Sequence, residues 1–157
     1  MHDGAVLLHY HRRLARWLPP GGHVDPDELP DAAAVRETRE EVGVEVEVVD
    51  AVSGEYWDDA RSQGMPTRLP SPMGIQLEDI PSRPGNPAHQ HIDLVYVAKV
   101  VAGASTMPTD VEGGSAPRWC KPDQWATLGL TPEVVSWAEA AIRIVGRAQR
   151  PGVRPQL

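Results

Sequence analysis

The sequence has few of the features that would place it in a membrane, outside the cell or on nucleic acid. Cys120 is its one cysteine, so no disulfide can form within the chain and a reducing, cytoplasmic location is expected. No apolar run approaches the roughly 18 residues of a membrane span, and no signal-peptide pattern opens the chain. Fifteen basic against 22 acidic residues give a net charge of −7, which disfavours nucleic acid as a partner because phosphate binding needs basic side chains.

What is present is the composition of one folded domain with long loops. Hydrophobic residues make up 41% of the 157 positions and charged residues 24%, which is typical of globular proteins. Sixteen prolines and fourteen glycines cluster between the apolar runs and therefore predict loops there. We expect a single domain over residues 1–149 and a flexible C-terminal tail over residues 150–157.

The apolar runs predict a mixture of helices and strands, which indicates an α/β or α+β fold. A helix is expected over Pro30–Val42, where proline suits the first turn and Gly43 is a stop signal, and another from Thr131 to about Ala148. Residues 17–22, WLPPGG, are expected to be irregular. Strands are expected over residues 4–10, 44–52, 74–77, 91–102 and 117–121.

Three glutamates of the first expected helix share one face. Glu37, Glu40 and Glu41 stand at positions i, i+3 and i+4, where like charges cost roughly a few tenths of a kcal/mol per pair. They also lie in the last turns, where the helix dipole favours cations. A divalent cation would relieve the repulsion, and clustered carboxylates suit Mg²⁺ or Mn²⁺. The alternative is a solvated acidic face paired with Arg36 and Arg39.

The longer stretch from Gly22 to Val44 resembles the Nudix box of the Nudix hydrolases. That pattern is Gly, five residues, Glu, seven residues, then Arg-Glu-aliphatic-any-Glu-Glu-any-Gly-aliphatic. Every specified position agrees except Thr38, where the family usually has an aliphatic residue and where the branched shape is retained. The specified positions of this chain are Gly22, Glu28, Arg36, Glu37, Thr38, Glu40, Glu41, Gly43 and Val44.

The resemblance implies a fold and an activity. The fold is an α/β/α sandwich around a mixed β-sheet, and the activity is hydrolysis of a nucleoside diphosphate linked to another group, with a nucleoside triphosphate or nucleotide sugar favoured. Only 21 residues precede the box glycine, so the family's usual first strand is expected to be missing or supplied differently. An open sheet edge would favour a homodimer or poor solubility. The alternative function is a nucleotide-binding sensor without catalysis, although such domains commonly lose the box carboxylates that this chain keeps.

The implied cofactor is Mg²⁺, with Mn²⁺ as a substitute. Water attack on an anionic pyrophosphate needs positive charge, and the side chains of the box are carboxylates, so metal ions must supply it. Glu112 fits the position from which family members add an acidic ligand; Asp110 is the near alternative, and a solvated loop acid is the other interpretation. The remaining ligands that the resemblance implies are Glu37, Glu40, Glu41 and the carbonyl of Gly21.

The resemblance also assigns catalytic roles within the box. Arg36 and Glu28 are implied to organise the loop and the helix through an ion pair, since arginine can hold a carboxylate at two points. Glu41 or Glu37 is implied to accept the proton of the attacking water, with the choice between them open.

Candidate substrate-binding residues lie outside the helix, and the alternative for them is an ordinary surface or loop position. His89 and His91 would touch phosphate or sugar; zinc is disfavoured because its ligands must converge and no cysteines are spaced for it. Tyr56 and Trp57 would stack on a planar group. The last two candidates are His23, which follows the box glycine, and Arg16, in a basic turn before the box.

Overall fold

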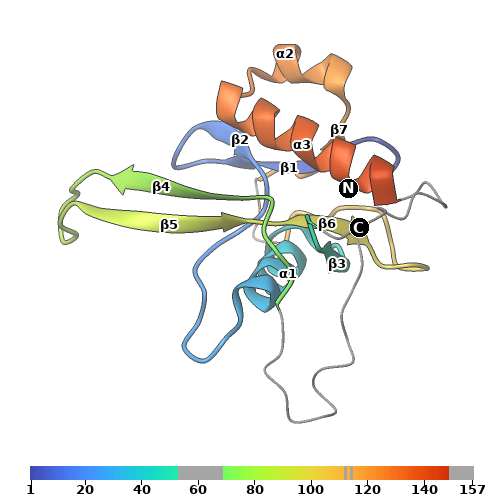
Figure 1. Ribbon diagram of the computed structural model, residues 1–157. Helices are drawn as coiled ribbons and strands as arrows, with labels where there is room; N and C mark the ends of the chain where they lie inside the picture. Colours follow the sequence, from blue (N-terminus) through green and yellow to red (C-terminus); the bar gives the residue numbers. More distant parts are fainter. Residues whose placement is uncertain (53–68, 112, 114, 149–157) are drawn as a thin grey trace, which may run out of the picture.

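The computed structural model of the chain describes residues 1–52, 69–111, 113 and 115–148. Its helices are α1 (Pro30–Val42), α2 (Trp125–Leu128) and α3 (Pro132–Ala148), with a 3₁₀ turn, η2 (Pro122–Gln124), before α2. Its strands are β1 (Val6–His11), β2 (Arg16–Leu18), β3 (Val46–Val49), β4 (Gly74–Ile80), β5 (His89–Val95), β6 (Val97–Val100) and β7 (Arg118–Cys120). Figure 1 shows α3 on one side of the strands and α1 on the other, which confirms the α/β class. None of the helices described here is long and apolar enough to cross a membrane.

The first strand, β1, is buried between two layers of helix. Successive side chains of a strand point to opposite faces, so β1 contributes to two apolar clusters. Val6 and Leu8 pack with Val134 of α3, while Leu7 packs with Val42 at the end of α1. The apolar run that predicted a buried strand therefore fills both interfaces at once.

The described strands form three antiparallel sets, with the orders β2-β1-β7, β3-β6 and β4-β5. The prediction that residues 17–22 are irregular is wrong at its start, because Arg16–Leu18 form β2. This strand pairs with the end of β1 and places Trp17 opposite Tyr10. The prolines that argued against regular structure begin only at Pro19, after the strand has ended.

The single strand predicted over residues 91–102 is two strands. β5 ends at Val95 and β6 begins at Val97, with Tyr96 between them. The two strands have different partners, since β5 pairs with β4 and β6 pairs with β3. The change of partner occurs inside one continuous apolar run, so local hydrophobicity does not mark it.

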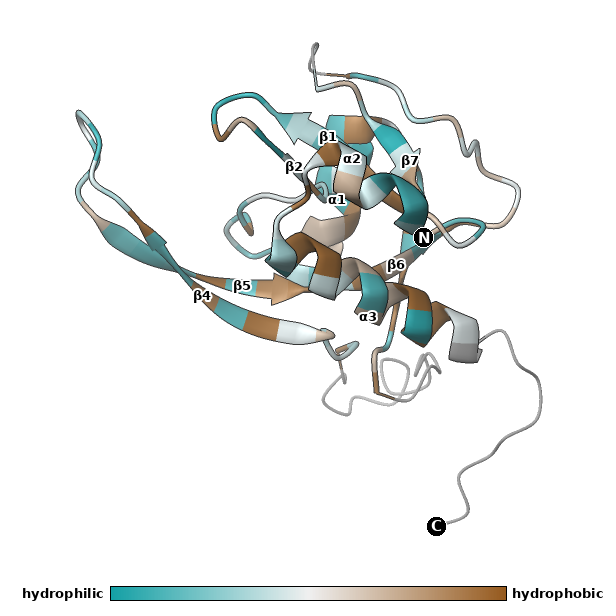
Figure 2. Ribbon diagram, turned by 90° about the horizontal axis from the view of Figure 1, so that it is seen from above, coloured by the Kyte–Doolittle hydropathy of each residue, from teal (hydrophilic) through white to brown (hydrophobic). Residues whose placement is uncertain are grey.

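The hairpin of β4 and β5 projects from the body of the molecule (Figure 1). Its two faces differ, because the strand alternation separates apolar from polar side chains. The register places Ile75 opposite Leu94 and Leu77 opposite Ile92, and these four side chains are exposed. The hydrophobic segments of the hairpin are visible in Figure 2. The opposite face is polar, with Gln76 opposite Asp93 and Glu78 opposite His91.

The helix α1 has the bounds predicted from its sequence. It ends at Gly43, whose φ of 67° is in the left-handed region and whose N–H donates to the Arg39 carbonyl at 3.0 Å. Thr38, the one departure from the box pattern, is only 8% exposed. Its hydroxyl donates to the Ala34 carbonyl at 2.7 Å, so the polar atom is satisfied within the helix.

Because the Thr38 hydroxyl serves only its own helix, Thr38→Val should be tolerated. We expect the free energy of unfolding to stay unchanged or rise by up to about 1 kcal/mol, since the Ala34 carbonyl keeps its helical partner. Thr38→Ser, which keeps the hydroxyl and deletes the methyl group, should lose about 1 kcal/mol. Urea denaturation followed by circular dichroism measures both, and a Thr38→Val variant less stable than Thr38→Ser would contradict this account.

Candidate functional site

The guanidinium of Arg36, on α1, uses all of its N–H groups within the box. Nε donates to Glu28 at 2.9 Å, and Nη2 donates to the other Glu28 oxygen and to the His23 carbonyl, both at 2.9 Å. Nη1 donates to Glu37 at 2.8 Å and to Glu40 at 3.0 Å. The ion pair of Arg36 with Glu28 is therefore present, as is the pairing of Arg36 with Glu40. This one side chain connects the loop before the helix to the acidic face of the helix.

The same contacts explain the charge state of the cluster. The pKa of Glu28 is lowered from 4.5 to about 2. The hydrogen bond from Arg36 is the largest cause, and the hydrogen bond from the backbone N–H of Asp25 is the second. The bonds to Glu28, Glu37 and Glu40 raise the pKa of Arg36 further above its ordinary value. Both partners are thus held in their charged forms across the neutral range.

Glu41 is held on the other side of the box. Its Oε2 accepts the Gly21 N–H at 2.9 Å and lies 3.6 Å from Nε2 of His9. His9 is 6% exposed and points from β1 toward α1 because strand alternation places it on the same face as Leu7. Sequence reasoning missed His9; the available signal was a polar residue inside an otherwise apolar strand. The amide of Gly21 contacts Glu41, while the role of its carbonyl stays a prediction.

The box glycine, Gly22, lies against a carboxylate. A Cβ added at Gly22 would overlap the carboxylate of Glu37, whereas one added at Gly21 would meet no atom within 4 Å. A side chain at this position would therefore have to displace the Glu37 carboxylate from its present place.

The donor types of the box fit a hard divalent cation, because Glu37, Glu40 and Glu41 offer carboxylate oxygens. Their present arrangement is not a closed cage. Glu37 and Glu40 share Nη1 of Arg36, and Glu41 is bonded to Gly21. To share one ion, Glu37 and Glu40 must turn from Arg36, their common partner.

Three histidines predicted to bind substrate lie close together beside the loop that begins the box. The rings of His23 and His91 have centroids 5.2 Å apart. Nε2 of His89 lies 3.1 Å from Nε2 of His91. The β4–β5 hairpin thus lies against the box loop, which brings His89 and His91 close to His23.

The other candidate site residues are not placed beside the box by the described part of the structure. Arg16 begins β2 opposite His11 with an exposed side chain, and none of the described contacts joins it to the box. Asp110 accepts the backbone N–H and the hydroxyl of Ser115, the latter at 2.8 Å. Residues outside the described part of the chain include Tyr56, Trp57, Glu112 and the expected tail, 150–157.

The NUDIX domain family model matches residues 2–143, and the chain therefore belongs to this family. Its fold resembles the crystal structure of a NUDIX-family hydrolase from Clostridium perfringens, with 26% identity, a TM-score of 0.71 and 91% of each chain covered. An Ap4A hydrolase from C. elegans shares the fold at 17% identity and a TM-score of 0.55, covering 91% of this chain and 87% of that one.

Curated relatives match over a shorter segment. Diphosphoinositol polyphosphate phosphohydrolase 3-alpha of Mus musculus is 50% identical over 42 residues, which are 27% of this chain and 26% of that protein. The asymmetrical bis(5'-nucleosyl)-tetraphosphatase of Mus musculus is 43% identical over 49 residues, or 31% and 33% of the two chains. The matches thus span about a quarter to a third of these relatives' lengths.

The ion pair of Glu28 predicts a specific response to acid. The pKa of Glu28 lies below its ordinary value of 4.5 in the folded protein. As the pH falls, the Glu28 carboxylate is therefore protonated in the unfolded chain before it is protonated in the folded one. Its contribution to stability is therefore complete above pH 4.5 and is lost as the pH falls toward about 2. Glu28→Gln should show a shallower loss of stability over this interval in urea denaturation at a series of pH values.

A matched control is Glu139→Gln, which removes an exposed carboxylate 3.8 Å from Arg143 on α3. It should follow the wild-type acid dependence, because exposed ion pairs contribute little. Equal slopes for Glu28→Gln and the wild type would show that the Arg36–Glu28 pair does not stabilise the fold.

Proposed function

We propose that this protein hydrolyses the pyrophosphate linkage of a nucleoside diphosphate joined to another group, in a reaction that needs a divalent metal ion. The observation that carries the proposal is the box itself. All of its charged residues are retained, and Arg36 holds the loop and the acidic face of α1 together through Glu28, Glu37 and Glu40. Binding domains without catalysis, the alternative, commonly lose these carboxylates.

The chemistry follows from the charges of the site. Mg²⁺, or Mn²⁺ in its place, would be held by Glu37, Glu40 and Glu41 and supplies positive charge for the substrate and a water of lowered pKa. Glu41 or Glu37 takes the proton of the attacking water, whose oxygen bonds to phosphorus as the bridging P–O bond breaks. Gly21 and His9 keep Glu41 oriented, since both lie beside its Oε2.

The relatives support this class of linkage more than any one substrate. The names of the two curated relatives refer to a diphosphoinositol polyphosphate and a bis(5'-nucleosyl) tetraphosphate, which share a phosphoric anhydride. For this chain we propose a nucleoside triphosphate or a nucleotide sugar. A reducing compartment such as the cytoplasm suits a chain whose single cysteine, Cys120, is buried and free.

A panel of anhydrides tests the activity. Nucleoside triphosphates, nucleotide sugars, ADP-ribose, dinucleoside polyphosphates and diphosphoinositol polyphosphates are incubated with Mg²⁺, Mn²⁺ or EDTA, and the phosphate products are measured. We expect turnover of one class with metal, none with EDTA, and a loss of roughly 10²-fold or more in Glu41→Gln. Absence of turnover for every substrate, from folded protein that binds Mg²⁺, would favour the binding alternative.

The two box glycines provide a matched pair of variants. In Gly22→Ala the new Cβ displaces the Glu37 carboxylate, so kcat/KM should fall by roughly tenfold to a hundredfold. Gly21→Ala keeps its N–H and meets no neighbour, so it should stay within about twofold of the wild type. Thermal melting of both variants checks the fold. Equal activities would show that the position of Glu37 is unimportant.

We also propose that the chain forms a homodimer through the β4–β5 hairpin. The support is its apolar face, where Leu77 and Ile92 are 62% and 69% exposed on paired strands. A twofold interface uses the same patch on both copies. Light scattering after size exclusion should give a dimer for the wild type and a monomer for Leu77→Lys. A monomeric wild type at high concentration would contradict the proposal.

A further inference from the structure

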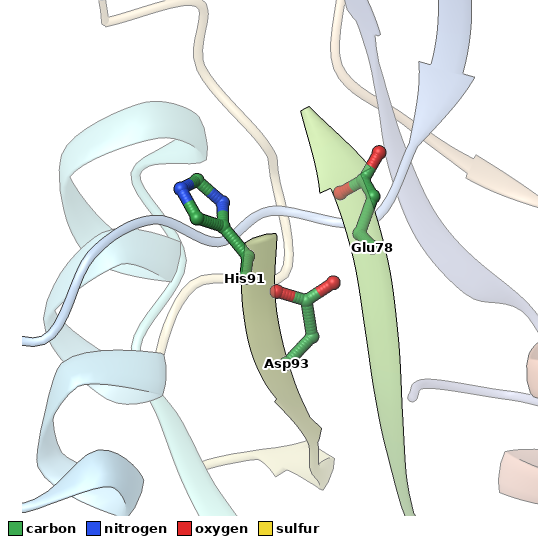
Figure 3. Close-up of side chains that lie close together, drawn as sticks. All are labelled: Glu78, His91 and Asp93. Carbon is green, nitrogen blue, oxygen red and sulfur yellow. The ribbon is translucent and has the colours of Figure 1, made fainter. Parts of the chain in front are cut away.

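The polar face of the β4–β5 hairpin brings together a second set of metal-binding side chains. The strand register places Glu78 directly opposite His91 and Gln76 opposite Asp93. One donor atom from each of Glu78, His91 and Asp93 lies within 4.8 Å of the other two. Figure 3 shows the three side chains facing one another from the two strands. The box carboxylates do not form such a group in the described part of the chain.

The hydrogen bonds of His89 and His91 determine which ring nitrogens carry protons. They leave a lone pair of His91 directed at the carboxylates of Glu78 and Asp93. Nδ1 of His89 lies 2.9 Å from the Pro87 carbonyl, which can only accept, so Nδ1 carries the proton. In the neutral ring Nε2 of His89 is then an acceptor, and Nε2 of His91, 3.1 Å away, must donate to it. Neutral His91 therefore has its lone pair on Nδ1, the ring nitrogen that faces Glu78 and Asp93 in Figure 3.

A cation placed between these three acceptors would accept a lone pair from each of them. One imidazole nitrogen and two carboxylates carry no proton of their own to share, and their lone pairs repel. A dication satisfies all three at once. The competing arrangement is a protonated His91 between the two acids, which binds no metal.

A hydrogen-bond chain from α3 fixes one of the ligands. The indole N–H of Trp137 donates to Oε1 of Gln76 at 3.1 Å, which sets the orientation of the Gln76 amide. The amide nitrogen then donates to Oδ2 of Asp93 at 3.2 Å and leaves Oδ1 for another partner. Gly74 lies against the same indole, because a Cβ there would overlap the Trp137 ring. Supporting contacts of this kind orient the ligands of metal sites.

We propose that Glu78, His91 and Asp93 form a second metal site, for a transition-metal dication such as Zn²⁺ or Mn²⁺. The imidazole favours Zn²⁺ over Mg²⁺, the two carboxylates also suit Mn²⁺, and three protein ligands leave coordination positions open. The ring of His23 lies 5.2 Å from that of His91, so the site adjoins the box loop while using none of the box carboxylates.

Histidine NMR of the wild-type protein tests the proposal without measuring hydrolysis. Metal-free, ¹⁵N-labelled protein is titrated with Zn²⁺ while long-range ¹H–¹⁵N spectra are recorded. We expect Nδ1 of His91 to shift with the first equivalent bound at the hairpin and Nε2 to stay protonated. His2, 3.4 Å from Asp3, is the internal control and should not shift. If both ring nitrogens of His91 are protonated and neither shifts when Zn²⁺ is added, the proposal is wrong.

Variants separate this site from the box. Asp93→Asn and Glu78→Gln should each weaken Zn²⁺ binding at the hairpin by at least about tenfold, measured by competition with a chromophoric chelator. Asp79→Asn is the matched control, because Asp79 follows Glu78 on the opposite face and accepts from Gln90 at 2.9 Å. It should bind Zn²⁺ as the wild type does.

A box variant, Glu37→Gln with Glu40→Gln, should lose the Mg²⁺ site and keep the hairpin Zn²⁺. Loss of that Zn²⁺ in the box variant, or wild-type binding by Asp93→Asn, would overturn the second site. Because the readout is Zn²⁺ binding, the outcome is independent of whether the protein is a hydrolase.

Discussion

The five N–H groups of Arg36 and the oxygens that accept them determine how the box is arranged. The side chain connects three segments of the box, since the His23 carbonyl, the Glu28 carboxylate and the acidic face of α1 all bond to one planar group. Without it, Glu37 and Glu40 would repel each other at the helix end that disfavours negative charge. The guanidinium thus allows a helix to carry carboxylates where stability alone would not place them.

This arrangement leaves the site attractive to cations. Arg36 contributes one positive charge, and Glu28, Glu37 and Glu40, which it binds, contribute three negative ones, so the group keeps two negative charges before Glu41 is counted. In the proposed metal complex, Arg36 would compete with the ion for Glu37 and Glu40, whereas its two-point bond to Glu28 uses a carboxylate with no proposed metal role. Binding of a dication can therefore exchange partners at the helix face while the loop stays attached through Glu28.

Much of the box was predictable from local sequence. The bounds of α1 follow from Pro30 and Gly43, and the spacing of the glutamates places them on one face. The split of the predicted strand at Tyr96 could not be predicted, because strand partners are chosen by distant residues. His9 stands out in the sequence as a polar residue in an apolar strand, but its contact with Glu41 depends on the fold. The approach of the histidines at positions 23, 89 and 91 also depends on the fold. The sequence disfavours zinc at these histidines, because it has no cysteines spaced for a site and does not show which side chains converge. Their convergence depends on the approach of the hairpin to the box loop.

Anomalous diffraction from crystals containing Mn²⁺ shows directly whether the carboxylates of the box bind a metal ion. We expect a peak bounded by Glu37, Glu40 and Glu41, with Glu37 and Glu40 turned from Arg36 and the Arg36–Glu28 pair intact. Crystals with Mn²⁺ at saturating concentration, no peak at the box and all three glutamates still on their present partners would contradict it.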